Sequence, residues 1–412
     1  MSAAPEPVRI PLPEVMTGPA VRAVIAALGA AGTEVRFVGG CVRDALAGRP
    51  VKDVDLATPD PPERSMALLR DAGLKAVPTG LAHGTVTAVA GGHGFEVTTL
   101  RVDVRTFGRH AEVAFTVDWR ADAARRDFTF NAMSAAPDGV LHDYFDGRRD
   151  LADGRVRFVG EPATRIAEDY LRVLRYFRFV AHFARGAPDA AARAACAAAA
   201  GSLGRLSGER VRNELLKLLA APDPLPALRL MAETGVLAAV LPEAQGFERL
   251  AALIAIDDGD PLRRLAALVG ARDGGLAQRL RLSNAERDRL IAAPSFDIAP
   301  DTTMPALRRR LYRAGGATTI DATLLSWAAR RAAGAAAPTD SAHGALLAVA
   351  RAWSRPTLPI KGRDAIAAGV ERGPRVNALV SAIEDWWVEG DFAADRAACL
   401  AELRRRVRAG EA

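Results

Sequence analysis

The pattern of apolar and polar positions divides this chain of 412 residues into a mixed first part and a helical remainder. One amphipathic helix is expected at about 18–31. Short apolar or alternating runs bounded by glycines then favour strands at 34–40, 51–58 and 84–100. From about Asp150 onward, apolar residues recur at helical spacing, for example along 163–184 and 207–222. The pattern therefore predicts an α+β chain with a head of roughly 150 residues.

Composition narrows the classes of protein that this pattern allows. The formal net charge is +6, which favours a polyanionic partner such as nucleic acid. The three cysteines are far apart in the sequence, so neither a zinc site nor a disulfide framework is expected, and a reduced, cytoplasmic protein is favoured. The first residues are proline-rich without an apolar signal core, and no run approaches the length of a membrane span.

The stretch FVGGCVRDALAGRPVKDVDLATP, residues 37–59, combines a glycine turn with two aspartates. Gly39 and Gly40 would let the backbone approach a phosphate ahead of a helix N-terminus. Asp53 and Asp55 stand at i and i+2 on the expected strand, so both carboxylates would leave one face and suit Mg²⁺. Alone, this pair more often marks an exposed strand edge. Ten or so residues after such a turn, it favours a two-metal phosphoryl-transfer site.

A third metal-binding carboxylate is expected on a neighbouring strand. Glu96, in GFEVTTLR, is the first choice, with Asp103 behind it. The alternative for Glu96, an ordinary polar position on an alternating strand, stays open.

The segment ARRDFTFNAMS, residues 124–134, is a second cluster. Arg125 and Arg126 could neutralise triphosphate oxygens, while Asp127 and Asn131 could hold ribose hydroxyls. The same residues could instead form a capped helix start. Residue types alone do not separate these two interpretations.

The segment AEDYLRVLRYFRF supplies a third cluster, in which Glu168, Asp169 and Arg172 would share one helix face. An ordinary helical salt bridge is the usual meaning of that spacing. The functional alternative is base recognition. Cytosine and adenine present an amino donor beside a ring-nitrogen acceptor, which a carboxylate and a guanidinium complement, whereas uracil and guanine present the reverse.

Four motifs, in this order and spacing, resemble those of one enzyme family: GGCVRD with KDVDLAT, RRDFTFNAM, EDYLRVLRYFRF and LSGERVRNELLKLL. Over residues 35–220 the chain resembles a bacterial class II tRNA nucleotidyltransferase, the CCA-adding enzyme of the poly(A) polymerase superfamily. The resemblance implies a polymerase-β-like nucleotidyltransferase head at 1–149, followed by an all-α neck at 150–222, body at 223–340 and tail at 341–412. It also implies tRNA as partner, CTP and ATP as substrates, and Mg²⁺ as cofactor, with no membrane; protein partners are not identified.

The resemblance assigns roles to individual residues. It implies that Asp53 and Asp55 bind Mg²⁺ and catalyse transfer, for which Glu96 is the candidate third carboxylate. Arg210 and Glu214 would support the base-recognition helix, and residues 101–115 would form a mobile loop needed for the final A. The expected nucleotide-binding residues are Gly39, Gly40, Arg43, Arg126, Asp127, Asn131, Asp169, Arg172 and Arg175.

Other functions remain open at this point. A bacterial poly(A) polymerase would share all four motifs, and a CC-adding enzyme would lack a working loop. A sugar transferase would use the aspartates but leave the arginine clusters unexplained. A catalytically inactive RNA-binding protein would be expected to lack Asp53 or Asp55, and both are present.

Overall fold

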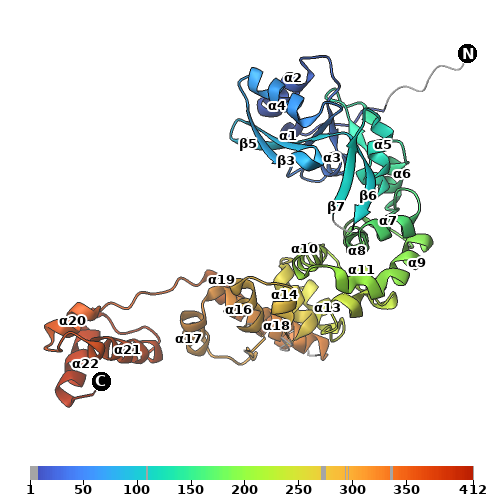
Figure 1. The fold of residues 1–412 in the computed structure, drawn as a ribbon. Helices are drawn as coiled ribbons and strands as arrows, with labels where there is room; N and C mark the ends of the chain where they lie inside the picture. Colours follow the sequence, from blue (N-terminus) through green and yellow to red (C-terminus); the bar gives the residue numbers. More distant parts are fainter. Residues whose placement is uncertain are drawn as a thin grey trace, which may run out of the picture. The chain divides into compact units, whose positions relative to one another are not determined.

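The computed structural model describes residues 8–107, 110–270, 275–292, 294–295, 297–334 and 337–411, without the side chains of 104–107, 110–112, 337 and 338. The chain forms two compact units, residues 1–242 and 243–412, and Figure 1 traces both. The predicted α+β class is confirmed, because a sheet-containing head precedes a helical remainder. The division into head, neck, body and tail is finer than these two units and stays a prediction.

The head is built on a seven-stranded mixed sheet with the order β3-β4-β5-β2-β1-β8-β9. Among its neighbouring strands, only β2 and β5 pair in parallel. The central position of β2 places the aspartate motif between two strands rather than at an edge. The strands are β1 (Arg36–Val38), β2 (Asp55–Thr58), β3 (Lys75–Gly80), β4 (Thr85–Ala90), β5 (His93–Thr99), β8 (Ser134–Ala135) and β9 (Leu141–His142).

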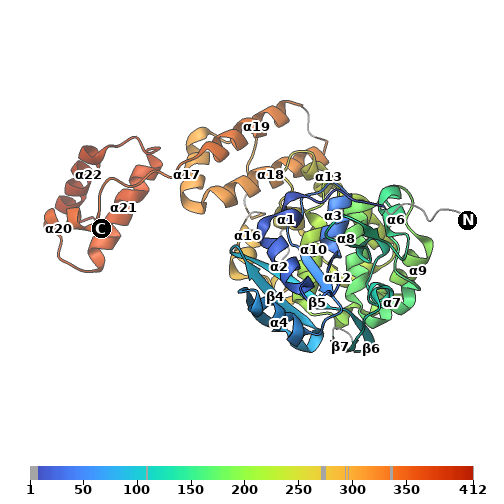
Figure 2. The same cartoon turned by 90° about the horizontal axis from the view of Figure 1, so that it is seen from above.

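Helices pack against this sheet and close its connections. The helices α2 and α4 contact each other and β4, and Figure 2 shows them beside the strands. The predicted helix at 18–31 is α2. The helices of this part are α1 (Glu14–Thr17), α2 (Pro19–Gly29), α3 (Gly40–Leu46), α4 (Pro62–Asp71), α5 (Trp119–Ala124) and α6 (Gly147–Asp153), with short 3₁₀ turns at Leu81–His83 and Thr129–Asn131.

The segment expected to be a mobile loop contains a hairpin. Strands β6 (Arg101–Phe107) and β7 (His110–Phe115) pair antiparallel, with a register shift between Asp103 and Arg105. Each of the two segments contains β-branched residues, such as Val102 in the first and Val113 in the second, which favour strands. The prediction of a loop did not take these residues into account. Residues 108 and 109, at the centre of the expected loop, lie outside the described residues.

Helices complete the first unit. Among them, α8 contacts α7, α10 and α11. The expected single helix over 163–184 is wrong, because the chain leaves helical geometry at Asp169 (φ −154°, ψ 108°) and begins again at Leu171. The helices are α7 (Pro162–Glu168), α8 (Leu171–Phe183), α9 (Ala190–Ala199), α10 (Gly208–Leu219), α11 (Leu225–Glu233) and α12 (Val236–Val240), with a 3₁₀ helix at Ala200–Arg205.

Aromatic side chains join α8 to the segment that follows α5. Phe128 lies 4.7 Å from Phe158 and 5.1 Å from Phe179, between ring centroids. Phe130 lies 5.2 Å from Phe179, and Tyr176 stacks on Phe158 at 5.8 Å. All five rings are fully buried, and pairs of this kind add about 0.5–1.5 kcal/mol beyond the buried area. This aromatic seam holds the helix of the third sequence motif against the second motif.

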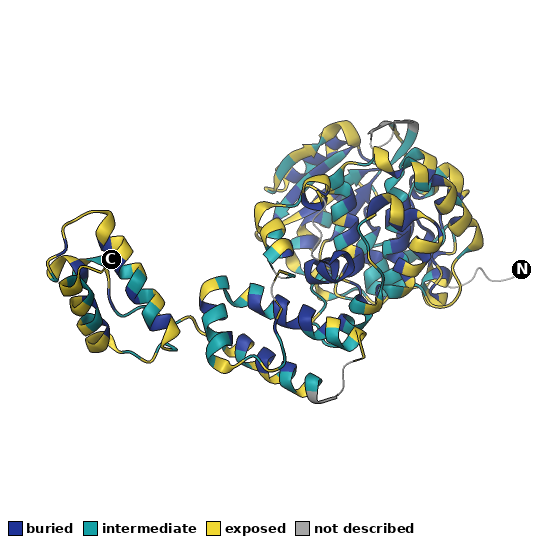
Figure 3. Ribbon diagram, turned by 90° about the horizontal axis from the view of Figure 1, so that it is seen from below, coloured by how far each residue is buried: buried dark blue, intermediate teal, exposed yellow. Residues whose placement is uncertain are grey.

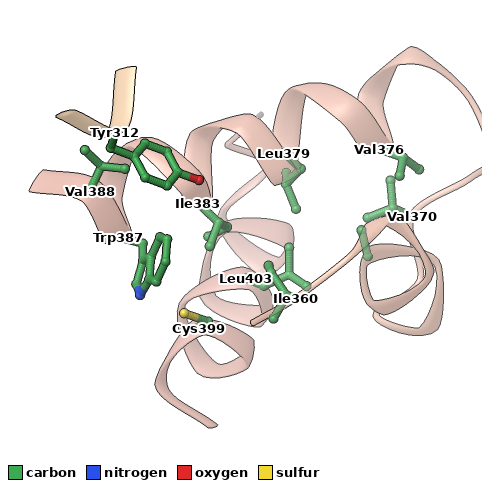
Figure 4. Packing of buried hydrophobic residues seen from close by; sticks show 11 residues of the cluster. Tyr312, Ile360, Val370, Val376, Leu379, Ile383, Trp387, Val388, Cys399 and Leu403 are labelled. Atoms are coloured by element: carbon green, nitrogen blue, oxygen red, sulfur yellow. The ribbon is translucent and has the colours of Figure 1, made fainter. Parts of the chain in front are cut away.

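The second unit is helical throughout its described part, with further buried residues (Figure 3). Its last helices enclose a core around Leu379, Ile383, Trp387 and Leu403, on which Tyr312 packs (Figure 4). Among the described residues, no helix of either unit is long and apolar enough to cross a membrane. The helices are α13 (Glu248–Ile254), α14 (Pro261–Val269), α15 (Leu276–Arg279), α16 (Asn284–Ala292), α17 (Met304–Ala314), α18 (Gly316–Ala332), α19 (Ala337–Ala352), α20 (Gly362–Ala367), α21 (Pro374–Glu389) and α22 (Arg396–Ala409).

Candidate active site

The glycine turn has the geometry that the sequence suggested. Gly39 has φ +71°, in the region that favours glycine, and α3 begins at Gly40. A Cβ atom on Gly39 would come within 2.9 Å of Nη1 of Arg126. A side chain at position 39 would therefore strain the backbone and displace this guanidinium.

The two aspartates are not both on the strand, as was expected. Strand β2 begins at Asp55, and Asp53 lies in the irregular segment before it, with an exposed side chain. Pairing explains this difference, because Asp55 is the first residue of β2 in register with β5, opposite Glu96. The i, i+2 spacing alone does not place both carboxylates on one strand face.

Asp55 is held among negative charges. Burial raises its pKa to about 6, Glu96 and Asp53 add to the rise, and Arg126 opposes it. Glu96 therefore lies close enough to Asp55 to affect its charge. Such proximity is needed if Glu96 is the third metal-binding carboxylate, as predicted. Asp103 lies on the separate β6–β7 hairpin.

The second cluster begins with two arginines on one carboxylate. Asp122 of α5 accepts from Arg125 at 2.9 Å and from Arg126 at 3.4 Å, and its side chain is 5% exposed. Burial opposes the charge of Asp122, but the two arginines outweigh it and lower its pKa. This shared carboxylate fixes Arg126 beside Gly39.

Asp127 is the centre of the second cluster. Its Oδ1 accepts from the backbone N–H of Phe128 at 2.9 Å and from Nδ2 of Asn131 at 3.0 Å, while its Oδ2 accepts from Nε of Arg175 at 2.6 Å. Burial disfavours the charged form, yet Arg175 and Asn131 lower the pKa of Asp127 below its usual value. Asn131 also accepts from Arg43 at 2.8 Å. Asp127 therefore does not act as an ordinary helix cap, which was the alternative interpretation of this segment.

The third cluster differs from the expected helix face. Asp169, in the break between α7 and α8, accepts from the N–H of Leu171 at 3.0 Å and from Arg210 at 2.6 Å. Arg172 instead bonds to Glu168 and donates to the carbonyl oxygens of Arg165 at 2.9 Å and Arg125 at 3.2 Å. The salt bridge between Glu168 and Arg172 thus forms, although the two residues flank a break rather than one continuous helix.

Most of the expected nucleotide-binding residues line one cavity of about 380 Å³. Asp169 does not line it, and among the described residues neither does Glu96 or Asp53. The members that line it are Gly39, Gly40, Arg43, Arg126, Asp127, Asn131, Arg172 and Arg175, together with the catalytic candidate Asp55. Residues from β2, α3, the segment after α5, and α8 therefore meet at one place.

A second cavity, of about 630 Å³, adjoins the first. It contains both Asp53 and Asp55 and shares Gly40, Arg43 and Arg178 with the first cavity. Asp55 thus faces both spaces, whereas Asp53 faces only the second.

Two further residues, Arg178 and Phe179, line the first cavity, which is called the nucleotide cavity below, and the sequence motifs did not single them out. The guanidinium of Arg178 lies 4.1 Å from the ring centre of Phe179 and donates to the buried Glu214 at 2.5 Å. The sequence contained a signal for both residues. They follow Arg175 by three and four positions on the same helix, and this spacing places them on the same helix face.

The residues around Asp55 fit a divalent cation by their chemistry. Burial first, and then repulsion from the carboxylates of Glu96 and Asp53, raises the pKa of Asp55. Oxygen donors of this kind suit Mg²⁺. Among the described residues, however, no three His, Cys, Asp or Glu side chains are grouped closely enough to hold a metal ion.

Comparisons with known proteins identify the family. The Poly A polymerase head domain matches residues 35–157, and the probable RNA and SrmB-binding site of polymerase A matches 187–247. The mitochondrial CCA tRNA nucleotidyltransferase 1 of Mus musculus is 35% identical over 389 residues, covering 90% of this chain and 87% of that protein. The chain belongs to the CCA tRNA nucleotidyltransferase family.

Further members of the CCA tRNA nucleotidyltransferase family agree with this result. The CCA-adding enzyme of Geobacillus stearothermophilus is 39% identical over 227 residues, and this match spans 54% of each protein. The crystal structure of the Bacillus stearothermophilus CCA-adding enzyme in complex with CTP superposes with a TM-score of 0.74 at 31% identity, covering 96% of this chain and 98% of that one. The likeness therefore extends through both units.

The raised pKa of Asp55 predicts how metal-free protein responds to pH. The folded state keeps a proton that the unfolded state releases between about pH 4 and pH 6, so the charged Asp55 lowers stability above that window. In EDTA at about pH 7.5, Asp55→Asn should be more stable than wild type by on the order of 1 kcal/mol, after allowance for partial exposure. At about pH 4 the two proteins should be equal. Thermal melting measures the difference.

The control for this experiment is Glu161→Gln, which changes an exposed carboxylate before α7. It should gain no stability at either pH. A gain for Asp55→Asn that is the same at both pH values would contradict the charged state assigned to Asp55.

Proposed function

We propose that this protein carries out CCA addition in the cavity that Asp55 and Arg172 share, with the residues named above in distinct roles. As a CCA tRNA nucleotidyltransferase, it adds C, C and A to tRNA 3′ ends without a nucleic-acid template, using CTP and ATP. The 3′-hydroxyl oxygen forms a bond to the α-phosphorus, the bond from that phosphorus to pyrophosphate breaks, and one proton is released. The observation that carries the assignment of residues is the convergence of the glycine turn, Asp55, Asp127 and Arg172 on one cavity.

Positive groups around the glycine turn would bind the triphosphate. Arg126 lies against Gly39 and is held there by Asp122, so its orientation is set before a nucleotide arrives. Arg43 is oriented by Asn131. Guanidinium groups held in this way suit phosphate oxygens, because little side-chain freedom is lost on binding.

Asp53, Asp55 and Glu96 would hold Mg²⁺, which when bound would activate the 3′-hydroxyl and neutralise charge on the phosphates. The two aspartates line the second cavity together, and this is where the tRNA 3′ end would enter. Asp55, shared by both cavities, would stand between the nucleotide and the tRNA end.

Asp127 would select the ribose, and Arg172 with Asp169 would recognise the base. Contacts with described residues use three of the five N–H donors of Arg172, which leaves donors for a ring nitrogen. Asp169 is bonded to Arg210, so recognition of the base amino group would require its carboxylate to turn toward the nucleotide cavity. This carboxylate still has lone pairs that accept no described hydrogen bond.

The finer assignments to a bacterial enzyme and to the cytoplasm are also proposals. The superposition on a Bacillus enzyme over nearly the whole chain is compatible with a bacterial enzyme, and the mitochondrial enzyme of Mus musculus matches over a similar length. The three cysteines are free and buried, which fits a reducing compartment.

The nucleotide incorporated distinguishes CCA addition from the alternatives. With tRNA that lacks its CCA end, wild-type protein should add two residues from CTP alone and three from CTP with ATP, and should leave UTP and GTP unused. Asp53→Ala and Asp55→Ala should add none, because the metal ligands are lost. Gel analysis of labelled products measures each step.

Three results would contradict this assignment of function and residues. A long ladder with ATP alone would indicate a poly(A) polymerase, and a product that stops at CC would indicate a CC-adding enzyme. Near wild-type addition by either aspartate variant would rule out that residue as an essential metal ligand.

Base selection should depend on Arg172. A contact with the base edge contributes about 1–3 kcal/mol of discrimination, which is about tenfold to a hundredfold in relative rate. Arg172→Ala should lower kcat/KM for CTP and ATP and narrow their advantage over UTP and GTP. Steady-state kinetics with all four triphosphates measures this ratio.

Arg165→Ala is the matched control for Arg172→Ala. Arg165 also forms an ion pair with Glu168, at 2.8 Å, but does not line the nucleotide cavity. Both variants are expected to lose stability, and only Arg172→Ala should change the preference for nucleotides. Equal selectivity in the two variants would leave Arg172 with a purely structural role.

A further inference from the structure

A third cavity, of about 650 Å³, is lined by residues of α6, the chain after α3 and the end of α8. Three arginines line it: Arg49, Arg148 and Arg185. All of its lining residues are described, and none of them is an aspartate or a glutamate. A cavity whose lining residues include three arginines and no aspartate or glutamate has the charge of an anion-binding site. None of the roles assigned above uses it.

Arg49 connects this arginine cavity to the catalytic carboxylates, because it also lines the cavity that contains Asp53 and Asp55. Its guanidinium lies 4.0 Å from the ring centre of Phe183 and donates to the carbonyl oxygen of His182. Among the described residues, no carboxylate forms an ion pair with Arg49.

The charge around Arg49 is not balanced by its neighbours. The carboxylate of Asp44 reaches Arg49 electrostatically, but it is already paired with Arg43 at 2.8 Å. Burial first, and then the charges of Arg49, Arg178 and Arg43, lower the pKa of His182, so its imidazole is held neutral and neither adds to nor offsets the positive charge. The positive potential of this region is therefore available to a ligand.

The other two arginines are placed differently. Arg185 donates to the carbonyl oxygens of Leu151 and Ala152, and its backbone packs on Gly154, where a Cβ atom would lie 2.6 Å from that of Arg185. Arg185 is therefore fixed against the end of α6. Arg148 is exposed on α6, and among the described residues its side chain has no ion-pair partner.

We propose that the arginine cavity binds a backbone phosphate of the tRNA 3′ strand, behind the nucleotide that carries the reacting hydroxyl. This inference rests on the proposed function, which places the triphosphate at the glycine turn and the 3′ end beside Asp53 and Asp55. A strand that ends there must continue away from the triphosphate, and the arginine cavity adjoins this position through Arg49. Its arginines would position the strand and would take no part in base selection.

A phosphate could also reach this cavity as pyrophosphate or as free nucleotide, and kinetics distinguishes these sources. Arg148→Ala and Arg49→Ala should each raise KM for tRNA lacking CCA about tenfold, since a charged hydrogen bond to phosphate is lost. KM for CTP and inhibition by pyrophosphate should stay within about twofold of wild type. Arg49→Lys, which keeps the charge, should recover part of the loss.

Arg149→Ala is the matched control, because Arg149 is the neighbour of Arg148 on α6 and is paired with Asp153 at 3.7 Å outside the cavity. It should leave KM for tRNA unchanged. Filter binding of tRNA at several salt concentrations adds a second readout. The plot of log affinity against log salt concentration has a negative slope. The magnitude of this slope should decrease by roughly 0.7–0.9 in Arg148→Ala and should not change in Arg149→Ala.

Equal KM values for tRNA in Arg148→Ala and Arg149→Ala would overturn the proposal, as would a change confined to CTP or pyrophosphate. Melting curves of Arg49→Ala show whether this variant loses stability. If it does, Arg148→Ala still tests the proposal, because Arg148 is exposed and its replacement should not affect folding. Filter binding separates this inference from the proposed function. A wild-type protein that adds no nucleotides would refute the function, whereas a normal salt slope in Arg148→Ala would refute the arginine cavity alone.

Discussion

The ion pair between Asp127 and Arg175 is the interaction on which the candidate active site depends. Its atoms lie 2.6 Å apart, and Asp127 is almost completely buried. Arg175 also lies 3.9 Å from the buried Glu214 of α10, which in turn accepts from Arg178. These charges are costly to separate, because the buried carboxylates of Asp127 and Glu214 would be left without partners in a medium of low dielectric constant. The chain of charges therefore fixes α8 between α10 and the segment after α5.

The position of α8 determines what the nucleotide cavity contains. Arg172, one turn before Arg175, is thereby presented to the same space as Asp55 and Arg126. The aromatic seam, which includes Phe128, Phe158 and Tyr176, supports this arrangement through buried apolar contacts. Ionic and apolar contacts thus act together, so the site is organised before a nucleotide binds, and less conformational entropy is lost on binding.

Local chemistry made part of this site predictable from the sequence. The positive φ of Gly39 and the start of α3 directly after it follow from glycine chemistry, and most residues that line the nucleotide cavity come from the sequence motifs. Pairing between distant segments was not predictable. Strand β2 begins at Asp55 because β5 pairs there, which excludes Asp53 from the strand. At the helix break Asp169 accepts a hydrogen bond from Arg210, 41 residues away. The resemblance implied a supporting role for Arg210, but no spacing rule places the break.

A double-mutant cycle on Asp127 and Arg175, read out by calorimetric CTP binding, tests the central claim most directly. If the pair acts as one unit that positions α8, Asp127→Asn and Arg175→Gln should each weaken CTP binding, and the double variant should be little worse than either. The coupling free energy should be about 1.5–3 kcal/mol, as for a hydrogen bond to a charged group. Additive losses, with a coupling near zero, would show that the two residues act separately and would contradict this account.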